Sequence, residues 1–200
     1  MSARAATAPL SQGVWNPVFT RIWAAIFLAS VSTYFLLMTL AAKVFASSGS
    51  ALWANSVVLT QWLPAVVALV PIRMAVARHP PRALLVFCEV GSALALLLVP
   101  LSYATIALLM AVLLCKGCMD ALSKVSRTVA LKGYFSGKAL ETAASYYNTA
   151  ALAGQAVGAL MGAVFLGHLG MGAMLVVCGA LHLAASALYQ SLPRADAAAS

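Results

Sequence analysis

Residues 22–42 read IWAAIFLASVSTYFLLMTLAA and carry no charged side chain between Arg21 and Lys43. A helix of about 20 predominantly apolar residues is long enough to cross the hydrocarbon core of a bilayer. Such a helix also satisfies its own backbone hydrogen-bonding groups, which lipid cannot do. This stretch therefore predicts a first transmembrane helix and sets the fold class for the rest of the chain.

Five further apolar stretches of similar length follow along the chain. Pro100 and Ser102 mark a turn between the third and fourth, whose combined length is about twice one membrane crossing. We predict an all-α membrane protein with a six-helix transmembrane domain at 22–192, a cytoplasmic segment at 1–21 and a cytoplasmic tail at 193–200. The predicted spans are 22–42, 51–72, 83–101, 103–123, 143–166 and 171–192.

The composition excludes an ordinary soluble protein. Apolar residues make up 64% of the chain and charged residues only 8%, whereas soluble domains carry about 25% charged residues. The net charge of +8 does not indicate nucleic-acid binding, because the positive residues lie in short segments between the apolar stretches. A disulfide framework is not expected, because all four cysteines lie inside apolar stretches. They are Cys88, Cys115, Cys118 and Cys178.

Lysine and arginine residues are distributed unevenly between the two sides of the predicted bundle. Ten lie in segments that face one side, and Lys43 alone lies on the other. Because an excess of lysine and arginine marks cytoplasmic segments, we expect a multi-pass protein of a bacterial inner membrane with both termini in the cytoplasm. The ten are Arg4, Arg21, Arg73, Arg78, Arg82, Lys124, Arg127, Lys132, Lys138 and Arg194.

Four short segments occur in a characteristic order. They are NPVFTRIW at 16–23, SGSAL at 48–52, RTVAL at 127–131 and GALMGA at 158–163. They are similar to the motifs N-x-x-F-x-R-x-W, T-G-S-A-L, R-x-A-L and G-P-x-x-G-G. Through them the chain resembles the N-terminal half of a major facilitator superfamily transporter, most of all the branch of enterobactin exporters and macrolide efflux pumps. The resemblance implies efflux of a small amphipathic compound, such as a drug, a siderophore or a secondary metabolite, by alternating access.

The segment PIRMAVARHPPR at 71–82 departs from that family's G-x-x-x-D-R-x-G-R-R loop. The positive charges of Arg73, Arg78 and Arg82 are kept, but the aspartate and both glycines are absent. The resemblance implies that this loop, together with Arg127 after the fourth span, controls the conformational change. Thr33 stands where the branch often carries an acidic residue.

A full transporter of this family has two related six-helix halves with the substrate site between them. The expected partner is therefore a second six-helix half or a second copy of this chain. The alternative is a non-transporting remnant, or a regulatory membrane partner of a full-length transporter.

Ionisable residues inside a span cost roughly 2.5–3.5 kcal/mol on insertion scales and are candidates for a function. Three meet this criterion: Glu89 in the third span, and Lys116 and Asp120 in the fourth. In a structural interpretation, Lys116 pairs with Glu89 or Asp120, while Lys124 and Arg127 extend to the membrane surface. In a functional interpretation, the stripe formed by Lys116, Asp120, Lys124 and Arg127 faces a central cavity, where it binds an anionic substrate or relays protons.

The fifth span carries two weaker sets of candidates. Gly154, Gly158 and Gly162 recur every four residues on one helical face and predict close contact with another helix. Tyr146 and Asn148 are candidates for substrate contact, although interface anchoring or packing is the simpler interpretation.

Other kinds of site find no support in the sequence. No arrangement of serine, histidine and aspartate stands out for hydrolysis and no phosphate-cradling motif is present, so we predict neither an enzyme nor ATP drive. His79, His168 and His182 are too scattered to predict a metal site. We expect no cofactor, and the expected partners besides a second half are the lipid bilayer and a small-molecule substrate, not nucleic acid.

Overall fold

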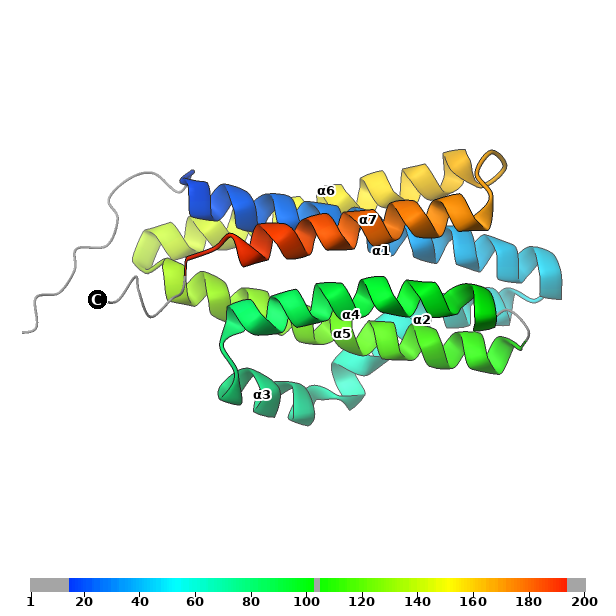
Figure 1. The fold of residues 1–200 in the computed structure, drawn as a ribbon, viewed down its shortest axis with the longest axis horizontal. Coiled ribbons are helices and arrows are strands. Elements are labelled where there is room, and N and C mark those ends of the chain that lie inside the picture. The colour runs from blue at the N-terminus through cyan, green and yellow to red at the C-terminus, as the bar shows by residue number, and fades with distance from the viewer. Residues whose placement is uncertain (1–14, 103–104, 194–200) are drawn as a thin grey trace, which may run out of the picture.

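Seven helices run through the residues that the computed structural model describes, which are 15–102 and 105–193 (Figure 1). Several predicted features lie outside these residues: most of the N-terminal segment with Arg4, the first two residues of the fourth span, and the tail at 194–200 with Arg194. The helices are α1 (Pro17–Ser48), α2 (Ala51–Val67), α3 (Leu69–Arg78), α4 (Pro81–Ser102), α5 (Ile106–Tyr134), α6 (Gly137–Phe165) and α7 (Met171–Gln190).

The lengths and hydropathy of these helices match five membrane crossings, or six if α2 and α3 together form one span. Within the described residues, α1, α4, α5, α6 and α7 are each long and apolar enough to cross a membrane alone. The pair α2 and α3 meets the same test jointly but is bent by 63°. The predicted all-α bundle of transmembrane helices is confirmed.

The second predicted span, 51–72, is wrong as a single helix. Pro64 has no N–H to donate to the carbonyl of Thr60, which weakens the helix at that turn. The helix ends four residues later at Ala68, whose φ of −94° and ψ of 17° leave the helical range. The chain then turns into α3, which leaves the bundle (Figure 1). Arg73 and Arg78 therefore lie on a helix, and Arg82 lies in the first turn of α4.

The predicted cationic loop between the fourth and fifth spans is also wrong. Helix α5 continues to Tyr134 and α6 begins at Gly137, so only two residues connect them. The hydropathy falls after residue 123 because of charged side chains, but lysine and arginine are good helix formers. Lys132 in the last turn also suits the negative end of the helix dipole. Arg127 is thus a helical residue and not a loop residue.

Specific residues define the ends of α1 and the start of α2. The side chain of Asn16 accepts a hydrogen bond from the Phe19 N–H at 2.8 Å, and Pro17 follows as the first helical residue. Gly49 ends α1 with a φ of 66°, a conformation that residues with a Cβ adopt reluctantly. Ser50 then caps α2 by accepting from the Trp53 N–H. Two of the motif-bearing segments are therefore helix boundaries.

The helices pack as two groups of three. Helix α1 packs against α6 and α7, and α5 packs against α2 and α4. Contacts between α4 and α7 and between α1 and α2 join the groups, and the start of α1 and the end of α7 lie at the same end of the bundle (Figure 1). This packing places α5, with most of the buried charges, beside α2 and α4.

Candidate functional site

The first buried polar cluster is centred on Asp120 of α5. Lys116 Nζ lies 2.6 Å from Asp120 Oδ2, one helical turn away. The same ammonium donates to Thr33 Oγ1 on α1 at 3.1 Å. Lys116 is only 2% exposed, so its charge depends on these partners for compensation. Of the two partners predicted for Lys116, the structure selects Asp120 over Glu89.

Asp120 also connects α5 to two other helices. Gln61 of α2 donates from Nε2 to Asp120 Oδ2 at 2.9 Å. Ser92 of α4 donates to Asp120 Oδ1 at 3.3 Å. Together with the Lys116–Thr33 bond, one carboxylate therefore joins side chains from α1, α2, α4 and α5. We call Thr33, Gln61, Ser92, Lys116 and Asp120 the Asp120 cluster.

The second cluster is centred on Glu89 of α4, which is 2% exposed. Arg127 Nη2 lies 2.8 Å from Glu89 Oε1, and Ser123 donates to the same oxygen at 3.0 Å. On the other side, His182 Nδ1 of α7 lies 2.8 Å from Glu89 Oε2. We call these four residues the Glu89 cluster. It ties α4 to both α5 and α7 at the centre of the bundle.

Arg127 does not extend to the membrane surface as the structural interpretation supposed. Its side chain is 11% exposed and turns inward to Glu89. Its guanidinium carbon also lies 5.9 Å from the centre of the Tyr189 ring, within cation–π range. The pair with Glu89 therefore compensates for the hydration that the guanidinium loses on burial.

His182 is a member of the site that was not predicted from the sequence. It is fully buried, and its Nε2 has no hydrogen-bond partner among the described residues. The available signal was its position in the middle of the sixth apolar stretch, where any ionisable side chain is a candidate. The scattered positions of the three histidines gave no reason to predict His182 as a metal ligand. The described residues contain no group of three or more side chains that could hold a metal ion.

A small polar pocket opens beside the Asp120 cluster, between α1, α2, α5 and α6. Its volume is about 110 Å³, enough for a few water molecules. Asp120, Lys124 and Arg127 reach it from α5, and Lys124 also lies 5.5 Å from the centre of the Trp62 ring. The charged stripe predicted on the fourth span thus borders this pocket over part of its length. The other polar residues in the lining are Ser30, Thr33, Tyr34, Gln61, Tyr147 and Gln155.

The other sequence candidates lie away from this pocket. Tyr146 packs against Trp15 and Phe19, with ring centres 5.1 and 6.3 Å away. Asn148 is exposed on α6, and the neighbouring Tyr147 lines the pocket instead. Arg73 and Arg78 are exposed on α3.

Arg82 and two other side chains hold the end of α7. Arg82 donates to the carbonyl of Gln190, and Arg21 donates to that of Ser191 at 2.7 Å. Tyr134 donates to the carbonyl of Pro193 at 2.6 Å. Carbonyls at a helix C-terminus have no partner within the helix, and cationic side chains suit its dipole. These bonds link the ends of α1, α4 and α5 to α7.

The three glycines of α6 face α1 at very short range. A Cβ added at Gly154 would lie 2.7 Å from the carbonyl oxygen of Phe27, and one at Gly158 would overlap the carbonyl oxygen of Val31. A Cβ at Gly162 would lie 2.7 Å from Met38 Cβ. Small residues allow helix backbones to approach closely in lipid, where packing replaces the hydrophobic effect.

The chain matches the family model of the Major Facilitator Superfamily over residues 22–200. The protein belongs to the major facilitator superfamily. Neither a curated protein nor a solved structure matches it. The sequence resemblance to this superfamily is confirmed, and membership makes the chain a multi-pass membrane transport protein and not an enzyme.

The helix contacts agree with the architecture of a half of a major facilitator protein. Such a half consists of two inverted three-helix repeats. Here α1 packs on α6 as α5 packs on α2, and α1 packs on α7 as α5 packs on α4. The first three spans are α1, α2 with α3, and α4, and the next three are α5, α6 and α7. Each contact made by a helix of one set is therefore matched by a contact of the corresponding helix in the other set. Helices α4 and α7, the third members of the two sets, meet at the Glu89 cluster.

Proposed function

We propose that this chain exports a small amphipathic compound, such as a drug, a siderophore or a secondary metabolite, as one half of a transporter of the enterobactin-exporter and macrolide-efflux type. The membrane is a bacterial inner membrane, and both termini are cytoplasmic because ten lysines and arginines lie toward one side. The observation that carries the proposal is the Lys116–Asp120 pair beside a polar pocket in a bundle of this family.

The size of the pocket supports a partner. Binding sites for drug-sized molecules have volumes of about 300–1,000 Å³, whereas this pocket measures about 110 Å³. A second six-helix unit, either a separate half or a second copy of this chain, supplies the remaining walls and encloses the substrate. Alternating access then consists of one unit rocking against the other around the site.

Lys116 is the residue that we assign to substrate charge preference. Replacing it with methionine is expected to abolish or alter efflux from cells, because the pocket then carries an uncompensated carboxylate. Lys132→Met is the matched control: it removes the same charge from an exposed position on the same helix. Efflux assays on both variants need a parallel measurement of their amount in the membrane.

A charge exchange separates a functional role from a folding role. Lys116→Asp combined with Asp120→Lys keeps the ion pair but reverses its direction. We expect the double variant to insert normally and to prefer substrates of different charge from the wild type. Unchanged efflux in Lys116→Met would overturn the assignment. Normal insertion of the wild type without transport of any amphipathic compound would favour a regulatory or remnant role.

A further inference from the structure

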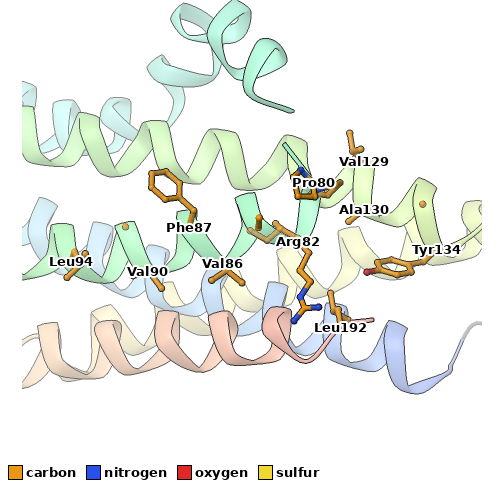
Figure 2. A pocket seen from close by; sticks show the side chains of 15 residues that line it. Pro80, Arg82, Val86, Phe87, Val90, Leu94, Val129, Ala130, Tyr134 and Leu192 are labelled. Carbon is orange, nitrogen blue, oxygen red and sulfur yellow. The ribbon is translucent and has the colours of Figure 1, made fainter. Parts of the chain in front are cut away.

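A long apolar groove lies on the outer surface of the bundle, away from the polar pocket. It runs along α4 beside the last turns of α5 and the end of α7, and its volume is about 930 Å³ (Figure 2). Phe87 and Leu94 line it and are more than half exposed. None of the residues of the polar pocket takes part in it. The groove is therefore a separate feature of the membrane-facing surface.

One end of the groove is cationic. Arg82, in the first turn of α4, is the charged residue in the described lining, and its side chain reaches toward Leu192 (Figure 2). A guanidinium has five N–H donors, so the bond from Arg82 to the carbonyl of Gln190 leaves others available. Tyr134 adds a phenol at the same end. Arg78 and His79 precede this end of the groove along the chain.

The rest of the lining is apolar and has the length of one membrane leaflet. From Arg82 to Leu94, α4 rises by about 18 Å at 1.5 Å per residue. Half of a hydrocarbon core of about 30 Å is about 15 Å. A molecule that contacts Arg82 at the membrane surface and follows α4 inward thus meets apolar side chains to the middle of the bilayer.

We propose that this groove binds an anionic phospholipid, with the phosphate at Arg82 and an acyl chain along Val86, Val90 and Leu94. Arginine forms bidentate hydrogen bonds with phosphate oxygens, and basic pockets between transmembrane helices bind anionic head groups. No acidic residue occurs in the described lining to oppose a negative head group. A zwitterionic lipid fills the same groove but lacks the net charge that complements this end.

The groove lies where a bound lipid affects helix positions. Arg82 also contacts the end of α7, and Pro80 and Pro81 join α3 to α4 at the rim. A phosphate on Arg82 therefore binds the side chain that links the start of α4 to the end of α7. None of the groove's residues belongs to the Asp120 or Glu89 clusters, so the proposal does not depend on substrate binding at those clusters.

The test is native mass spectrometry of the purified chain exchanged into mixed micelles that contain equal amounts of phosphatidylglycerol and phosphatidylcholine with identical acyl chains. The wild type is expected to retain phosphatidylglycerol roughly fivefold over phosphatidylcholine, the preference that one basic residue near a membrane surface confers. Arg82→Gln is expected to lose this preference. Equal retention of the two lipids by the wild type would overturn the proposal.

Two matched controls separate lipid binding from folding. Arg21→Gln removes the same charge and also one hydrogen bond to the end of α7, but Arg21 does not line the groove. Val90→Trp fills the groove, whereas Leu183→Trp places the same ring on an exposed site of α7 outside it. Arg21→Gln and Leu183→Trp should bind lipid like the wild type. Loss of the preference for phosphatidylglycerol in both arginine variants would contradict the proposal. Equal retention of phosphatidylglycerol by the two tryptophan variants would contradict it as well.

Discussion

At the scale of single residues, Glu89 compensates the buried charge of Arg127. Its two oxygens accept from or contact Ser123, Arg127 and His182 on two other helices. A buried ion pair contributes little net stability relative to an apolar replacement, but removing one partner leaves the other charged and unpaired. The contribution of the Glu89 cluster to stability therefore depends on all four side chains being present, and not on any single hydrogen bond.

This dependence predicts the behaviour of Arg127 variants. Arg127→Met leaves Glu89 without its cation and is expected to lower the free energy of unfolding by about 3–5 kcal/mol. Adding Glu89→Gln removes the unpaired charge and should restore most of that loss. Thermal unfolding of both variants in one detergent measures the difference. If the double variant is less stable than Arg127→Met, the pairing is not the dominant effect.

Within the described part of the chain, His182 has a hydrogen-bond partner at one ring nitrogen. Its Nδ1 lies 2.8 Å from Glu89 Oε2, and an asparagine amide can place a donor close to that position. We expect His182→Leu to lower the free energy of unfolding by about 1–3 kcal/mol, because it leaves a buried carboxylate oxygen without its partner. His182→Asn should cost clearly less. Equal losses in the two variants would show that ring packing, and not the hydrogen bond, is what His182 provides.

At the scale of helices, the contact between α1 and α6 depends on the absence of side chains. The backbone of α1 fills the space that a Cβ on α6 would occupy. A comparable approach occurs between α5 and α2, where a Cβ at Gly117 would overlap the carbonyl oxygen of Thr60. That carbonyl is the one that Pro64 leaves without its helical donor. The two contacts correspond to each other, because α5 corresponds to α1 and α2 corresponds to α6 between the two three-helix repeats.

Gly158→Ala tests this packing with a single methyl group. The new Cβ would overlap the Val31 carbonyl, so α1 and α6 must separate, at a cost of about 1–3 kcal/mol. Gly179→Ala on α7 is the matched control, since its Cβ meets no atom within 4 Å. Alanine there should raise stability by up to about 1 kcal/mol, because alanine is the better helix former. The melting temperatures of the two variants should therefore move in opposite directions.

The helices were predictable from the sequence to different degrees. Long uncharged stretches such as residues 22–42 define a crossing almost by length alone. The continuation of α5 through Lys124 and Arg127 was not predictable from hydropathy, because charge lowers hydropathy without breaking a helix. The partners of Glu89 were not predictable either. Arg127 and His182 are 38 and 93 residues away, and which faces meet depends on helix rotation and depth, which a single sequence does not specify.

At the scale of the whole molecule, the two broad faces of the bundle differ in chemistry. The polar pocket lies between α1, α2, α5 and α6, and Trp62 of α2 stands at its edge, half exposed. On the other side, α4 and α7 pack together and present apolar side chains such as Leu97, which is 69% exposed. Polar groups in a membrane face protein or water, and not lipid. The pocket face is therefore the side on which we expect the proposed second six-helix unit to pack.

Cross-linking in native membranes tests which face is covered. In a background without native cysteines, Trp62→Cys on the pocket face is labelled with a thiol-reactive photo-cross-linker, which can react with any neighbouring chain. Illumination is expected to give a cross-linked product of roughly twice the mass. Leu97→Cys on the α4 face is the matched control, and it should stay at the mass of one chain because lipid surrounds it. A product of doubled mass identifies a second copy, and another mass identifies a different six-helix chain. Cross-linking through Leu97→Cys alone would place the partner on the opposite face. A single-chain mass for both cysteine variants would contradict the proposed pairing, because the pocket would then have no covering unit.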